Sequence, residues 1–239
     1  MSFALGFYEI FSYAIPGFLY ILVLNGFLQL FKFPHIKLGQ VPGTLGFIIL
    51  AALLSYIAGH LADPLAYRWY KVFNRQGEDE KAVARIAGMY PELNIGFKAS
   101  DWRMLYSFIK HNDLYLAEYL TKFNAIGIML QNLSLVLFLF ALTQGAFIFI
   151  TGQLLRYIPG TLLGLFFSFI AIKRSAIFKS WYSQGIFEQA LHYGTSVEKM
   201  FKEEWSVEKT PAPVEKPRDR RKTSTSKNSK TKTTKKKAT

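Results

Sequence analysis

Residues 123–155 read FNAIGIMLQNLSLVLFLFALTQGAFIFITGQLL and contain no Asp, Glu, Lys or Arg. Three further stretches, 10–31, 43–59 and 157–172, are uncharged in the same way. A helix that crosses the hydrocarbon core of a bilayer needs roughly 20 mostly apolar residues, and a charged residue at its centre costs ~2.5–3.5 kcal/mol. The four stretches therefore predict an all-α integral membrane protein with four transmembrane helices.

Charges and prolines between these stretches set the expected boundaries of the spans. Asp63-Pro64 is expected to break or kink the second helix, and Lys173-Arg174 is expected to end the fourth span. The expected order is a transmembrane hairpin over 1–62 with spans at about 9–31 and 43–62, a helical cytoplasmic segment over 63–122, a second hairpin over 123–174 with spans at about 123–150 and 154–172, an amphipathic interfacial region over 175–206, and a disordered basic tail over 207–239.

The segment between the two hairpins has the periodicity of short amphipathic helices. Apolar residues recur at helical spacing over 80–89 and again over 102–109. Leu114 is expected to begin a further helix that runs directly into the third span.

The distribution of Lys and Arg predicts the orientation in the membrane. The segment over 63–122 has nine Lys and Arg and the stretch over 173–206 has five, whereas the hairpin over 32–42 has two and the turn over 151–156 has one. Positive residues are retained on the cytoplasmic side. We therefore expect a protein of the cell (inner) membrane with both termini and the segment over 63–122 in the cytoplasm.

Small residues follow one face of the second span. Ser55, Gly59 and Ala62 form a smooth line, and small residues at this spacing let two helix backbones approach closely in lipid. The line predicts a packing surface, against either the first span or another subunit of a homo-oligomer.

His60, Asp63 and Glu9 are the weak candidates for catalytic residues. His60 and Asp63 lie three residues apart and can share a helix face, while Glu9 begins the first span at the same level. An Asp beside a His can orient the ring for proton transfer. The competing interpretation is a structural polar cluster, because all three residues lie at span ends, where charged groups reach water.

Other chemistry has no support in the sequence. The chain has no Cys, and motifs for nucleotide binding, serine hydrolysis and zinc proteolysis are missing. We therefore expect no cofactor and no metal site.

The tail over 207–239 carries twelve Lys and Arg against three Asp and Glu, which is +9 of the chain's net charge of +13. Its low hydrophobicity and high charge predict disorder. Anionic lipid headgroups are the expected partner, and the residues that would meet them are Arg218, Arg220, Arg221, Lys222, Lys235, Lys236 and Lys237. Nucleic acid is a less favoured partner, since no aromatic residue follows Trp205 to stack on bases. A solvated tail without any partner is the third interpretation.

Three functions remain open. The first is a membrane protein without chemistry of its own, an oligomeric sensor, scaffold or membrane-perturbing effector with a soluble cytoplasmic partner, of the kind that bacteria use in stress or phage defence. The second is a small channel or transporter, although the spans hold few polar residues to line a pathway. The third is an intramembrane enzyme that uses His60 and Asp63.

The charge distribution yields a prediction about topology. Reporter fusions at Gly39 and Gly152 should read as external, and fusions at Gly77 and Thr239 should read as internal, because the positive segments stay in the cytoplasm. An external reading at Gly77 would overturn the predicted orientation.

Overall fold

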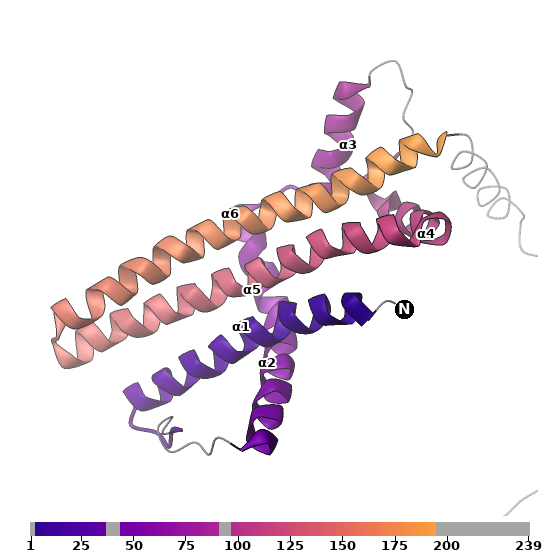
Figure 1. Ribbon diagram of the computed structural model, residues 1–239. Helices are drawn as coiled ribbons and strands as arrows, with labels where there is room; N and C mark the ends of the chain where they lie inside the picture. Colours follow the sequence, from indigo (N-terminus) through magenta and orange to yellow (C-terminus); the bar gives the residue numbers. More distant parts are fainter. Residues whose placement is uncertain (1–2, 37–43, 91–96, 195–239) are drawn as a thin grey trace, which may run out of the picture. The chain divides into compact units, whose positions relative to one another are not determined.

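The computed structural model describes residues 3–36, 44–90 and 97–194, all of which belong to one compact unit over residues 1–198. Every element in this part of the chain is helical (Figure 1). The elements are α1 (Phe3–Leu30), α2 (Leu45–Phe73), α3 (Glu78–Met89), the 3-10 helix η2 (Ala99–Asp101), α4 (Trp102–Asn112), α5 (Leu114–Thr151) and α6 (Leu154–His192). The predicted basic tail and the last part of the predicted amphipathic region lie outside the described residues.

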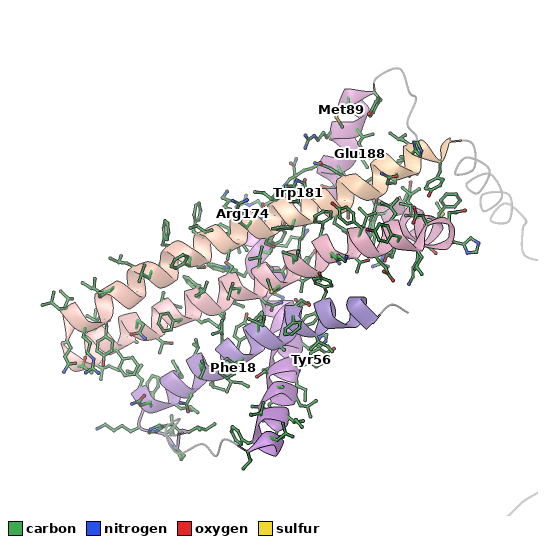
Figure 2. All side chains as sticks on the ribbon, in the orientation of Figure 1. Phe18, Tyr56, Met89, Arg174, Trp181 and Glu188 are labelled. Atoms are coloured by element: carbon green, nitrogen blue, oxygen red, sulfur yellow. The ribbon has the colours of Figure 1, made fainter. Side chains whose placement is uncertain are left out.

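Four of these helices, α1, α2, α5 and α6, are long and apolar enough to cross a membrane, as the sequence predicts. Only 11–28% of the most apolar window of each helix is buried within the structure. Large apolar side chains accordingly stand out into the surroundings along all four (Figure 2). A soluble monomer rarely exposes contiguous apolar patches of more than a few hundred Å².

Two helices continue past the points where the sequence suggests a boundary. α2 runs through Asp63-Pro64 to Phe73, and α6 runs through Lys173-Arg174 to His192. Proline removes one backbone donor, but its neighbours Leu61, Ala62, Leu65 and Ala66 suit a helix and α2 carries on. α6 extends as one helix into the region predicted as a separate amphipathic element. α5 begins at Leu114 and runs without a break to Thr151, which confirms the expected fusion with the third long helix.

α5 and α6 form an antiparallel hairpin, and their contact is the most extensive between two helices in the described part of the chain. Gly152 ends α5 with a left-handed backbone (φ 69°), and α6 begins two residues later. Ser134 and Ser168 each donate a hydrogen bond of 2.8 Å to the backbone carbonyl of the other. Ser175 donates a third, also of 2.8 Å, to the carbonyl of Gly127. These interhelical bonds fix the register of the two helices.

α1 packs on α5 and runs in the same direction. Lys122 lies over the Tyr8 ring (5.6 Å), Tyr20 donates to the Asn132 carbonyl (3.0 Å), and Gly26 lies beside Thr143. The position on α5 therefore rises with the position on α1. The end of α1 consequently lies at the same end of the molecule as the α5–α6 turn.

α2 runs across α1 and α5 and contacts both of them (Figure 1). Its first contact is with α1, where Gly17 and Gly59 bring the two backbones together. A Cβ atom on Gly59 would overlap the Tyr13 carbonyl, and one on Gly17 would overlap the Ser55 carbonyl. Ser55 is buried and Ala62 is half-buried. Within this chain, Ser55 and Gly59 of the small-residue face thus lie against α1. Self-association through this face stays a prediction of the sequence.

A group of shorter elements packs on the start of α5 and the end of α6, and we call this group the head. It comprises α3, η2, α4 and the adjoining turns of α5 and α6. Its fully buried apolar side chains include Ala82, Ile86, Leu105, Ile109, Ala117, Ile186 and Phe187. The helical periodicity predicted over 80–89 and 102–109 is thereby confirmed, since α3 and α4 bury the expected faces.

Substituting Gly59 with Leu should destabilise the α1–α2 contact. The added side chain meets backbone rather than a flexible side chain, and overpacking of this kind costs typically ~1–3 kcal/mol. Thermal unfolding of the detergent-solubilised protein measures the loss. Gly46→Leu is the matched control on the same helix, because a Cβ at Gly46 meets nothing within 4 Å. Equal melting temperatures for the two variants would contradict the close approach at Gly59.

Candidate functional site

A cluster of polar side chains lies where α1, α2, α5 and α6 meet, and we call Tyr20, Asp63, Gln131, Asn132 and Lys179 the Asp63 cluster. The Asp63 carboxylate accepts hydrogen bonds from the side-chain amides of Asn132 (2.9 Å) and Gln131 (3.5 Å). Both amide residues are almost fully buried, at 0% and 1% exposure. The Tyr20 hydroxyl of α1 donates a hydrogen bond to the Asn132 backbone carbonyl. A carboxylate of α2 is thus held by amides of α5.

Lys179 joins this cluster to the head. Its ammonium group donates to the Gln131 side-chain carbonyl and lies 4.3 Å from the centre of the Tyr70 ring. The Tyr70 hydroxyl in turn donates to a carboxylate oxygen of Glu78 (2.7 Å), at the start of α3. Gly127 leaves room for the lysine stem, since a Cβ there would come within 2.8 Å of the Lys179 Cγ. A line of polar contacts therefore runs from Asp63 to the head.

One atom of the Asp63 cluster has no hydrogen-bond partner among the described residues. The Asn132 Oδ1 atom is buried and accepts no hydrogen bond there, although its Nδ2 donates both to Asp63 and to the Ile128 carbonyl. Leaving a buried acceptor unsatisfied costs ~1–3 kcal/mol. Beside the Asp63 carboxylate, this oxygen could accept a bond from a proton donor or coordinate a small cation.

The structure places His60 and Asp63 in different surroundings. The His60 ring stacks on Tyr13 of α1, with ring centres 3.8 Å apart, and meets the Tyr56 ring edge-on. It borders a cavity of about 230 Å³ whose walls also include Asn124. No hydrogen bond links His60 to Asp63 in the described part of the chain. Glu9 lies in α1, and its side chain lies outside what the structure describes.

Sequence reasoning missed most of the Asp63 cluster. Gln131 and Asn132 were visible as adjacent amides inside the longest uncharged stretch, and Lys179 as a lone charge in a helical region. What the sequence did not show is that α2 contacts α5 at this level and brings Asp63 against these amides. Among the described residues, no group of three or more His, Cys, Asp or Glu could hold a metal ion.

Comparison with protein-family models, with curated proteins and with solved structures gives no match.

The contact between α3 and α6 contains a second half-buried carboxylate. Asp79 of α3 accepts a hydrogen bond of 2.6 Å from the Ser183 hydroxyl of α6. Partial burial raises the pKa of the Asp79 carboxyl above its ordinary value, and the charges of Glu78 and Glu80 act in the same direction. The Ser183 hydrogen bond and the charge of Lys71 oppose this rise in pKa.

The raised pKa predicts a pH dependence of stability. The folded state holds the Asp79 proton more tightly than the unfolded state, so this contribution is complete below the ordinary pKa of about 3.9 and is lost as pH rises through the folded value. Asp79→Asn should therefore gain thermal stability relative to the wild type as pH rises from about 4 to 7. Ser183→Ala removes a bond that lowers the pKa, and its stability should fall more steeply over the same range. Parallel melting curves for Asp79→Asn and the wild type at every pH would contradict this assignment.

Proposed function

We propose that the chain is a four-span membrane protein that relays changes in its membrane spans to a cytoplasmic head, without chemistry of its own. The four long apolar helices and their large outward-facing apolar surface support membrane insertion. The excess of Lys and Arg over 63–122 supports a cytoplasmic head. The parallel course of α1 and α5 agrees with this orientation, because it brings the end of α1 and the α5–α6 turn to one side.

The lengths of α5 and α6 locate the Asp63 cluster in such a bilayer. These helices have 38 and 39 residues, which is about 57 Å each at 1.5 Å per residue. The hydrocarbon core is about 30 Å thick, so each helix reaches far beyond it into the head. Asn132 lies 19 residues before Thr151, about 28 Å from the turn. The cluster therefore sits near the cytoplasmic edge of the core, between the spans and the head.

The observation that carries the relay is the line of contacts from Asp63 through Gln131 and Lys179 to Tyr70 and Glu78. It connects three spanning helices with the first turn of α3. A shift of α2 relative to α5 would change the partners of Asp63 and hence those of Lys179. The head would convey this change to a soluble partner, for which the exposed Leu114, Tyr115 and Tyr119 offer apolar and aromatic surface.

A transporter is the second candidate, and the Asp63 cluster itself favours it. An ionisable residue at membrane depth marks ion and proton pathways in many membrane proteins. Asp63 next to the unsatisfied Asn132 Oδ1 is an arrangement that could bind a proton or a small cation. The experiment below separates this candidate from the relay.

The relay predicts that bilayer thickness changes the protection of the head. The full chain, reconstituted in thin and in thick bilayers, should show different amide hydrogen exchange over α3, because hydrophobic mismatch tilts the spans. Asp63→Asn and Lys179→Met should abolish most of that difference, and Lys179→Met should cost about 1–3 kcal/mol of stability by leaving Gln131 unsatisfied. Lys173→Met, an exposed lysine of the same helix, is the control and should respond like the wild type.

Two outcomes would overturn the relay. The first is α3 exchange that is the same in both bilayers or whose response survives Asp63→Asn. The second is cation or proton flux in liposomes that Asp63→Asn abolishes, which would establish transport instead.

A further inference from the structure

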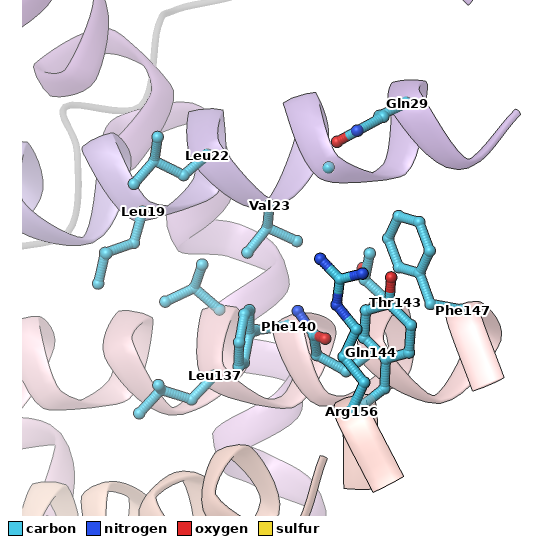
Figure 3. Close-up of a pocket in the computed structure, with 13 residues that line it drawn as sticks. Leu19, Leu22, Val23, Gln29, Leu137, Phe140, Thr143, Gln144, Phe147 and Arg156 are labelled. Atoms are coloured by element: carbon cyan, nitrogen blue, oxygen red, sulfur yellow. The ribbon is translucent and has the colours of Figure 1, made fainter. Parts of the chain in front are cut away.

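A cavity of about 540 Å³ lies between α1, α5 and the start of α6 (Figure 3). Its body is apolar, with walls that include Leu19, Leu22, Leu137 and Phe140. Polar side chains gather at the end nearest the α5–α6 turn, where Gln29, Gln144 and Arg156 line it. Its volume lies within the range of about 300–1,000 Å³ that is typical of sites for small organic ligands.

Arg156 gives the polar end of this cavity a positive charge. Figure 3 shows its guanidinium reaching from α6 into the space between α1 and α5, toward Gln144. Among the described residues, this guanidinium donates a long hydrogen bond to the Gln153 side chain (3.4 Å) and lies 5.5 Å from the centre of the Tyr157 ring. The one salt bridge in the described part of the chain joins Lys81 and Glu78, so no described carboxylate neutralises Arg156.

We propose that this cavity binds an anionic phospholipid of the surrounding bilayer, with one acyl chain in the apolar body and the phosphate on Arg156. The proposal rests on the membrane insertion proposed above, but not on the relay. A guanidinium matches the geometry of a phosphate better than any other side chain, because it presents paired N–H donors in a rigid fork. Gln29 and Gln144 would add hydrogen bonds to the headgroup or the ester groups.

The position of the cavity agrees with this occupant. Its wall on α5 extends from Val136 to Phe147, a rise of about 16 Å, which is about half the thickness of a hydrocarbon core. Arg156 lies at the level of the α5–α6 turn, where headgroups would lie. The apolar part and the charged part of the cavity thus follow one another along the membrane normal, in the same order as the acyl chains and the headgroup of a lipid in one leaflet.

Native mass spectrometry of the detergent-purified full chain can measure the binding. Phosphatidylglycerol and phosphatidylcholine are titrated separately. Arg156→Gln should weaken the first phosphatidylglycerol bound by about tenfold, since a charge-assisted hydrogen bond to phosphate is lost. It should weaken phosphatidylcholine less, because the choline cation of that headgroup offsets the negative charge of its phosphate. Arg174→Gln removes the same charge from an exposed position elsewhere on α6 (Figure 2) and should bind like the wild type.

A second pair of variants tests the apolar part of the site. Gly26 lines the cavity, and a Cβ there meets only the Thr143 methyl at an ordinary 3.8 Å, so Gly26→Leu should fold and fill the space. It should weaken both lipids, whereas Gly46→Leu on α2 should weaken neither.

Several results would overturn the lipid site. Equal losses from Arg156→Gln and Arg174→Gln would mean general charge attraction, and unchanged binding by Gly26→Leu would mean that the cavity is not used. If a second copy of the chain or a soluble compound binds here instead, and its binding depends on the same residues, then the lipid is not the ligand of this cavity. Carbonate washing of membranes distinguishes the two proposals, because a chain that washes off fails membrane insertion itself, whereas a chain that remains and binds no lipid fails only this site.

Discussion

The pairing of α5 with α6 depends on two serine hydroxyls, each of which donates a hydrogen bond to a backbone carbonyl of the other helix. Ser134 and Ser168 are buried, and each donates to the backbone carbonyl of the opposite residue. In apolar surroundings such interhelical bonds contribute about 0.6–1.7 kcal/mol each. Their larger effect is on register. The Ser175–Gly127 bond lies seven residues later on α6 and seven residues earlier on α5, so sliding by one residue would break every bond at once. The positions of Gln131 and Asn132 follow from that register.

The role of α2 follows from this fixed pair. Because α5 presents two amides between its serine contacts with α6, a helix that crosses there gains by offering a carboxylate, and Asp63 does so. Further along α2, Trp69 donates to Ser134 (3.1 Å) and stacks on Phe138. Trp69 therefore packs α2 on α5. α2 thus contacts both α1 and α5, and its last turns reach α3 through the Tyr70–Glu78 hydrogen bond.

The helices could be predicted from the sequence and the Asp63 cluster could not, because the first depend on local properties and the second depends on contacts between distant residues. Uncharged stretches and helical periodicity are local properties, and they located four long helices, α3, α4 and the continuous α5. The continuation of α2 past Pro64 is not local, since it depends on the partners that Asp63 and Trp69 find on α5. The same holds for α6 beyond Arg174, which packs on α3 and α4. The spacing of His60 and Asp63 allows them to share a helix face, but His60 stacks on α1 whereas Asp63 accepts hydrogen bonds from α5.

The stem of Lys179 lies against Gly127, and this contact constrains how the chain can change over evolution. Any side chain at position 127 would collide with the lysine Cγ, whereas a shorter residue at position 179 would remove the obstacle. Substitutions at the two positions should therefore appear together in related sequences: a lysine at 179 with glycine at 127, and an alanine or serine at 127 only where 179 has become small. Gln131 would lose its cationic partner in the latter group and should itself drift toward apolar residues there.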